Sequence, residues 1–213
     1  MFSRTIWGAR TSLTVGVAAI LFGMLVGGSL GMIGGYFRRT SDRIISFIFL
    51  LLLSFPALVL AILITSLLSR SLFTISITLG VLAVAPVGRV ARANTIAFSD
   101  REFVMAARTL GAKHPRIIFR ELLPNVVIPM SALALLGVAV AIVAEGGLAF
   151  LGLSVETGTT WGKLIQIGSG RRELEKAPWI AMAPIAVLFL TVLSLNFAGD
   201  RLRAYFDVRE TAL

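Results

Sequence analysis

Five long stretches of this sequence contain no Lys, Arg, Asp or Glu. They are Thr11–Phe37, Ile44–Ser69, Ser71–Gly88, Leu122–Ala144 and Ala177–Gly199. A helix needs about 20 apolar residues to cross the hydrocarbon core of a bilayer, and a charge at its centre costs at least about 2.5 kcal/mol. The stretches therefore predict membrane-spanning helices. With 57% hydrophobic and 15% charged residues, the composition excludes a soluble domain and a disordered chain.

We expect an all-α, polytopic membrane protein in which residues 1–213 form one transmembrane domain with five spanning helices. The predicted spans are 11–37, 44–69, 71–93, 122–145 and 177–199. Residues 94–124 then form a loop on one side of the membrane. Residues 146–176 form a mixed polar segment on the other side.

The basic residues predict which side is which. Most of the Lys and Arg residues lie in the 38–43 loop, in the 89–120 segment and in the tail with Arg201, Arg203 and Arg209. These three regions share one side of the membrane, and an excess of positive charge marks the cytoplasmic side. The C-terminus is therefore expected in the cytoplasm. The net charge of +9 is interpreted as a signal of topology rather than of nucleic-acid binding.

Glycines recur every four residues in the first predicted span, at Gly23, Gly27, Gly31 and Gly35. Because glycine has no Cβ atom, such a ladder lets a neighbouring helix approach closely. We expect these glycines to pack against another helix, which the pattern alone does not identify.

Two residues are candidates for a translocation pathway. Pro56 lies in the middle of the second span, where its missing N–H should kink the helix. Such a kink fits a pathway and fits plain packing equally well. Glu145 ends the fourth span, and a carboxylate at that depth should face protein or water. It either lines the outer vestibule or fastens the end of the helix.

The 94–124 loop contains an amphipathic pattern. Phe103, Ala106, Ala107 and Leu110 follow helical spacing, with Asp100 as a plausible N-cap and Gly111 as the stop. A second short helix is expected from Pro115 to Pro124. A DNA-binding hairpin has no room between two spans, and contact with anionic lipid is an alternative. Docking of the apolar stripe into a cytoplasmic partner fits the pattern best.

This loop resembles the EAA loop of the membrane subunits of binding-protein-dependent ABC importers. Five residues match at the family's spacing, namely Ala106, Ala107, Gly111, Leu123 and Pro124. Met105 stands where the family usually has Glu, and Glu121 stands where it usually has Ile. A contact made by the family's usual Glu is therefore not carried over to Met105. The segments AEGGLAFLGLSVE, WGKLI and LNFAGDRLRAYFD are similar to the dipeptide and oligopeptide permease branch in particular.

The resemblance implies how the chain works. It would be one half of a heterodimeric permease in a bacterial inner membrane, with two ATPase subunits beneath and an extracytoplasmic peptide-binding protein above. A coupling helix in the EAA loop would dock into an ATPase groove. The residues implied in coupling are Glu102, Phe103, Met105, Ala106, Ala107, Arg108, Gly111, Ala112, Leu123 and Pro124.

The resemblance also implies that this chain is a non-catalytic subunit that binds no cofactor, and that ATP and Mg²⁺ are bound by the partner ATPases. No Walker A sequence, no cysteine and only one histidine, His114, occur in the sequence, so neither a phosphate loop nor a multi-histidine metal site is expected. The expected cargo is a peptide; nickel or another small solute is an alternative within the family, and a self-contained carrier is an alternative outside it. The family usually has six spans, so we expect a helix to be missing before Met1.

Overall fold

The computed structural model describes the backbone of residues 1–211 and the side chains of residues 1–206. Asp207, which ends one of the family-like segments, and Arg209 of the basic tail lie outside the side chains described.

The described chain is built from helices. The first part contains α1 (Phe2–Gly23), the π-helical stretch η1 (Met24–Gly28), α2 (Ser29–Phe37), α3 (Arg39–Ser54), α4 (Ala57–Leu67) and α5 (Leu72–Ser99). The second part contains α6 (Glu102–Thr109), α7 (His114–Arg116), the π-helical stretch η2 (Ile117–Leu122), α8 (Leu123–Phe150), α9 (Trp161–Gly168), α10 (Arg171–Lys176) and α11 (Trp179–Thr211).

Four stretches of helix are long and apolar enough to cross a membrane. They are Phe2–Phe37, Leu72–Ser99, His114–Phe150 and Trp179–Phe206. The pair α3 and α4 passes the same test only when taken together, and it is bent by 84°. Counted as one broken span, this pair gives a fifth crossing.

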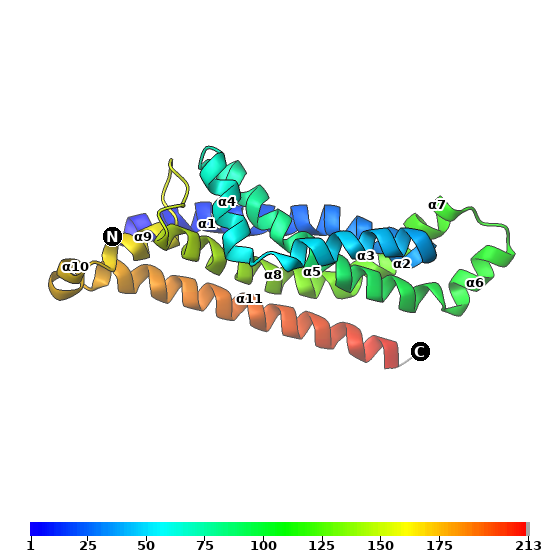
Figure 1. The fold of residues 1–213 in the computed structure, drawn as a ribbon. Helices are drawn as coiled ribbons and strands as arrows, with labels where there is room; N and C mark the ends of the chain where they lie inside the picture. The colour runs from blue at the N-terminus through cyan, green and yellow to red at the C-terminus, as the bar shows by residue number, and fades with distance from the viewer. Residues whose placement is uncertain (212–213) are drawn as a thin grey trace.

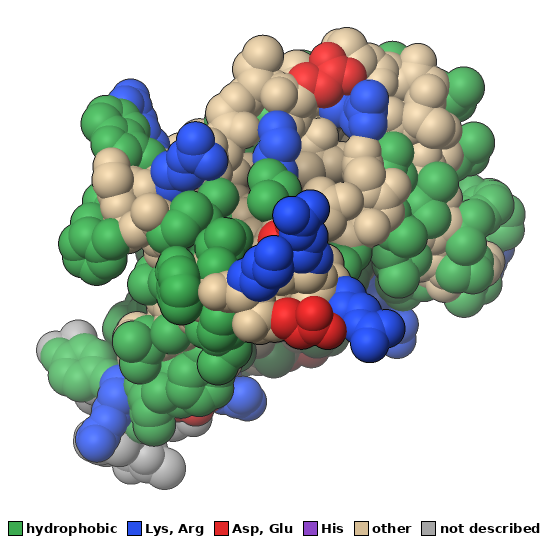
Figure 2. All heavy atoms as spheres, turned by 90° about the vertical axis from the view of Figure 1, so that its left-hand side faces the viewer, with side chains coloured by type: hydrophobic (Ala, Val, Ile, Leu, Met, Phe, Trp, Pro, Cys, Tyr) green, Lys and Arg blue, Asp and Glu red, His purple; other side chains and the backbone are tan. Residues whose placement is uncertain are grey.

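The long helices lie side by side along one axis, with the chain termini at opposite ends of the bundle (Figure 1). The end that carries α6 and α7 is also the end at which the described chain stops, whereas α9, α10 and the N-terminus occupy the other end. Figure 2 looks onto that second end, where Lys and Arg side chains are spread between apolar flanks. Arg171 in α10 is among the most exposed of them, with 94% of its side chain accessible.

Of the three buried clusters in the described chain, the smallest packs Ile45 and Phe49 of α3 against α5, and the other two join the long helices to one another. One joins α1, α5, α8 and α9 through residues such as Val15, Ile75, Ile142 and Trp161. The other lies toward the α6 end and joins α2, α5, α6, η2 and α8. Its members are Met32, Tyr36, Val87, Ala91, Val104, Ile117, Leu122, Val126 and Met130.

Helix ends differ from the predicted span ends where packing extends a helix. Glu145 does not end α8, which continues through Gly146 and Gly147 to Phe150, because Leu148 and Ala149 are fully buried and hold the extra turn in place. Pro124 does not end a short helix either. It lies just after the π-helical stretch η2, inside a helix that runs on from His114 to Phe150. A local π-helical adjustment of this kind lets a membrane helix accommodate proline.

The backbone breaks at Pro56. α3 ends at Ser54 and α4 begins at Ala57, with Phe55 and Pro56 in extended conformations. The residue before a proline is driven out of the helical region, and the proline has no N–H to give back to the helix. The result is a sharp corner rather than the kinked continuous helix that the sequence predicts.

Candidate functional site

The α6 helix is held at the end of the bundle by three of its side chains. Val104 is its one buried residue, and it packs in the second cluster with Tyr36. Ala107 is partly buried against the same cluster, and the guanidinium of Arg108 lies over the Tyr36 ring.

The helix begins after Arg101 without a side-chain cap. Asp100, expected as the cap, bonds to Arg38 instead. The other residues of α6 are exposed.

The apolar stripe of α6 faces away from the protein. Phe103 is 38% exposed and Leu110 is 87% exposed, while Ala106 is exposed and Ala107 half-buried. Met105 is also exposed, at 51%. An apolar stripe on a short helix gains nothing from facing water. The exposed part of the stripe, formed by Phe103, Ala106 and Leu110, is therefore a candidate surface for a partner.

A shallow groove of about 340 Å³ runs along this stripe. Its walls are formed by Phe103, Ala106, Ala107, Leu110, Gly111, Ala112, Arg116 and Glu121. Arg116 and Glu121 are the two charged residues among those that line it. Glu121, which replaces the usual Ile of the family, is thus placed to contact whatever enters the groove.

Gly111 makes the turn that ends α6. Its φ is +79°, in the left-handed region that residues with a Cβ rarely adopt. The backbone N–H of Gly111 donates to the carbonyl of Arg108, and that of Ala112 donates to the carbonyl of Ala107. These bonds close the helix and direct the chain back toward α7, so that α6 and η2 form the two sides of the groove.

An aromatic cluster joins α6 and α7 to the end of α2. The hydroxyl of Tyr36 lies 2.7 Å from Nδ1 of His114, and the Arg108 guanidinium lies 5.5 Å from the centre of the Tyr36 ring. Phe37 packs against both Tyr36 and His114, with ring centres 5.0 and 5.7 Å away. A cation over an aromatic face is attracted to it, so Arg108 is held on the α2 side of its helix.

Two ion pairs connect the α2–α3 turn to α5. Arg38 donates two hydrogen bonds of 2.7 Å to the carboxylate of Asp100. Arg92 of α5 donates from both Nε and a terminal nitrogen to Asp42 in the first turn of α3. Such fork-shaped pairs are the strong ones among protein ion pairs.

The four glycines of the ladder all face α5. A Cβ atom on Gly23 would stand 2.8 Å from the Cβ of Ala83, and one on Gly35 would stand 2.8 Å from the carbonyl oxygen of Arg92. Gly27 and Gly31 are tighter still, since a Cβ there would overlap the carbonyl oxygens of Val84 and Gly88. The ladder is therefore the seam between the first helix and α5.

Pro56 and Glu145 are not part of the α6 site. Pro56 is exposed at the corner between α3 and α4. Glu145 is fully buried near the α9 end, where its Oε1 accepts a 2.8 Å bond from the Ser154 hydroxyl and its Oε2 has no partner. Ser154 lies in the loop before α9 and is 3.3 Å from the hydroxyl of Thr160, the cap of α9. Glu145 thus fastens this loop to α8.

Several residues at the site were not found from the sequence. Tyr36, Phe37, Arg38 and His114 carry no motif, and their partners lie more than 60 positions away along the chain. The only signal is that an aromatic pair and an Arg pair end the first span on the basic side. Trp161 at the start of α9 is buried, and it donates from Nε1 to the carbonyl of Thr5 at 2.9 Å.

The fold and the site together define a class of protein. Several apolar helices cross a membrane, and one short helix at the end of the bundle presents an open apolar stripe. Residues 19–211 match the family described as "Binding-protein-dependent transport system inner membrane component". The chain belongs to this family, and it is a multi-pass permease subunit of a binding-protein-dependent ABC importer.

Relatives share the sequence over most of the chain. The chain is 38% identical to a dipeptide transport system permease protein of Alkalihalophilus pseudofirmus, over 97% of this chain and 68% of that protein. It is 34% identical to an oligopeptide transport system permease protein of Haemophilus influenzae, over 97% and 66%. It is 31% identical to a glutathione transport system permease protein of Pectobacterium atrosepticum, over 97% and 68%.

Solved structures share the fold. A chain of the MetNI methionine ABC transporter in an inward-facing conformation matches with a TM-score of 0.78 at 20% identity, over 96% of this chain and 97% of that one. A chain of an amino acid ABC transporter solved with histidines matches with a TM-score of 0.70 at 15% identity, over 95% and 94%.

Proposed function

We propose that this subunit couples ATP hydrolysis by partner subunits to the import of peptides. The observation that carries the proposal is the placement of α6. Val104 is buried in the core, whereas the stripe of Phe103, Ala106 and Leu110 is open to a partner. An amphipathic helix that lays its apolar face into a groove is a recurrent mode of protein recognition. In an ABC importer the ATPase subunit supplies such a groove.

The assembly that follows has one role for each subunit. This chain pairs with a homologous permease subunit to enclose the pathway, and ATP and Mg²⁺ are bound by two ATPase subunits on the α6 side. The chain itself is non-catalytic. The α6 end and the C-terminus face the cytoplasm of the bacterial cell, and an extracytoplasmic peptide-binding protein delivers cargo at the α9 and α10 end. The relatives named for dipeptides, oligopeptides and glutathione support a peptide as the cargo.

The docking step is tested by a charge placed on the stripe. In the assembled importer, Ala106→Glu puts a carboxylate at the apolar interface, where its desolvation is costly. We expect at least a tenfold loss of ATPase binding, about 1.4 kcal/mol, and a parallel loss of uptake. Replacing Ala107 or Gly111 by a bulky charged residue should uncouple transport as well.

The matched control is Thr109→Glu, which places the same charge on an exposed residue of α6 outside the stripe. It should leave ATPase binding close to the wild-type level. Equal ATPase binding by wild type, A106E and T109E would contradict the docking role of the stripe.

The cargo is tested separately, by uptake into vesicles that contain the complete importer and its binding protein. Labelled di- and oligopeptides should enter in an ATP-dependent manner, with Ni²⁺ and single amino acids as comparisons. Uptake of Ni²⁺ without uptake of any peptide would overturn the assignment of peptides while leaving the docking role intact.

A further inference from the structure

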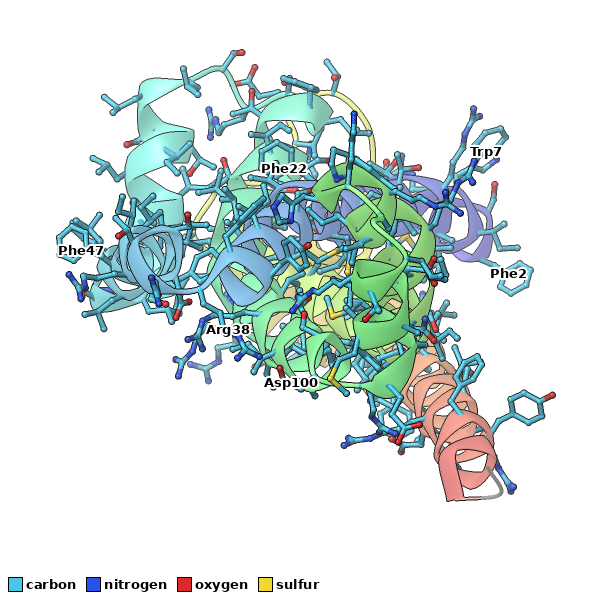
Figure 3. The ribbon with its side chains drawn as sticks, turned by 90° about the vertical axis from the view of Figure 1, so that its right-hand side faces the viewer. Phe2, Trp7, Phe22, Arg38, Phe47 and Asp100 are labelled. Carbon is cyan, nitrogen blue, oxygen red and sulfur yellow. The ribbon has the colours of Figure 1, made fainter. Side chains whose placement is uncertain are left out.

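Both ends of the segment that contains α6 are fastened to the same turn of the first helix. Asp100 lies just before α6 and is bonded twice to Arg38. His114 lies just after the loop that follows α6 and is bonded to Tyr36. Arg38 and Tyr36 are separated by one residue, Phe37. Figure 3 shows Arg38 and Asp100 close together at this end of the bundle, where the α2–α3 turn meets the start of α6.

The turn is shaped to hold these contacts. Tyr36 is only 7% exposed and belongs to the buried cluster that also contains Val104 of α6, so its ring connects the core to the surface. Arg38 and Arg39 both have positive φ values, 52° and 46°, which are uncommon for residues with a Cβ. This conformation ends α2 abruptly and lets Arg38 reach Asp100 across the bundle end.

The same turn is rigidly connected to the membrane helices. α1, η1 and α2 run on without a break over 36 residues, and the glycine seam fixes this long helix against α5. A Cβ on Gly35, one residue before Tyr36, would stand 2.8 Å from the carbonyl oxygen of Arg92 and 2.9 Å from the Cβ of Thr95. Because the first helix and α5 are in such close contact, a displacement of one helix is transmitted to the other.

From this geometry we infer that Tyr36 and Arg38 are positioning residues for coupling. A displacement of α6 by its ATPase partner is passed through Asp100 and His114 to the last turn of the first helix, and from there to α5. The inference rests on the proposed docking of α6. It adds that a displacement of α6 reaches the bundle through the first helix. The other two routes are α5 and α8, the long helices that precede and follow the segment containing α6.

The ion pair is tested by charge exchange in the complete importer reconstituted in proteoliposomes. Arg38→Asp or Asp100→Arg alone places like charges together. Each should lower the amount of peptide transported per ATP hydrolysed by about threefold or more, since an exposed pair contributes up to about 1 kcal/mol and charge reversal adds repulsion. The double exchange R38D/D100R should restore the ratio. A restored ratio identifies the pair, because a general loss of folding would not be rescued by a second change.

Tyr36→Phe keeps the ring and removes only the hydroxyl that meets His114. It should lower transport per ATP by about two- to fivefold, the value of one hydrogen bond, with ATPase subunits still bound.

Arg39→Asp is the matched control for Arg38→Asp. It makes the same change of charge one residue along, on a side chain with no ion pair among the described residues.

The inference is overturned if R38D, D100R and Y36F all transport at the wild-type ratio, or if the double exchange is as impaired as the single ones. These results are distinct from failure of the docking proposal. If only the inference is wrong, A106E still loses the ATPase while the Tyr36 and Arg38 variants stay coupled. If docking is wrong, A106E binds the ATPase normally.

Discussion

The hydroxyl of Tyr36 donates to or accepts from Nδ1 of His114 at 2.7 Å, although the two residues are 78 positions apart in the sequence. Tyr36 lies in the last turn of the first long helix, and His114 begins the helix that becomes α8. Between them in the chain lie the corner at Pro56, the whole of α5 and the exposed helix α6. This bond therefore closes the segment that carries the apolar stripe against the core of the bundle.

The seam between the first helix and α5 predicts a contrast between two neighbouring glycines. Gly27→Ala would place a Cβ against the carbonyl of Val84, 2.9 Å from its carbon, and overpacking of this kind costs about 1–3 kcal/mol. A Cβ on Gly28 meets nothing within 4 Å. The thermal unfolding midpoint in detergent should fall for G27A and change little for G28A. Equal effects of the two substitutions would refute the seam.

The bond between Glu145 and Ser154 predicts that Glu145→Ala and Glu145→Gln differ in how well they protect the loop between α8 and α9. Glu145→Ala removes the acceptor of the Ser154 hydroxyl in a buried site, and leaving a buried donor unsatisfied costs about 1–3 kcal/mol. The loop between α8 and α9 should then be cut faster in limited proteolysis. Glu145→Gln retains an acceptor oxygen and should protect the loop nearly as well as Glu. Rapid cleavage of E145Q, at the rate of E145A, would show that the charge itself is needed.

The pair formed by Asp42 and Arg92 predicts a cost of removing its negative charge. Arg92 of α5 donates from two nitrogens to Asp42, and neither side chain is fully exposed. Asp42→Asn keeps the size of the side chain but weakens the pair, so the thermal unfolding midpoint in detergent should fall. A midpoint equal to that of the wild type would show that the pair does not hold α3 against α5.

Much of this architecture was predictable because charge is excluded from a membrane so strongly. The four long spanning helices lie over predicted spans, and the glycine ladder was correctly expected to face a helix. The stripe of Phe103, Ala106 and Leu110 was found from spacing alone. The stripe is exposed because the segments before and after α6 contact the bundle, whereas within α6 the buried residue is Val104.

The remaining features depend on contacts that no local pattern encodes. A proline in an apolar run predicts a bend, but the 84° corner at Pro56 depends on what α4 packs against. Asp100 was expected to cap α6 from its position, yet a bidentate bond to Arg38 replaces the weaker bond to a backbone N–H. The burial of Trp161 likewise depends on a distant partner, since its Nε1 donates to the carbonyl of Thr5.

The absence of cysteine from the sequence permits the most direct test of the central claim. A single cysteine introduced at Ala106, on the open stripe of α6, should form a cross-link to the ATPase subunit in membranes that contain the assembled importer. A cysteine at Arg171, an exposed residue at the opposite end of the bundle, should form none. Cross-linking from Ala106 alone is the result expected if α6 docks the ATPase; cross-linking from Arg171 alone, or from neither position, would contradict it.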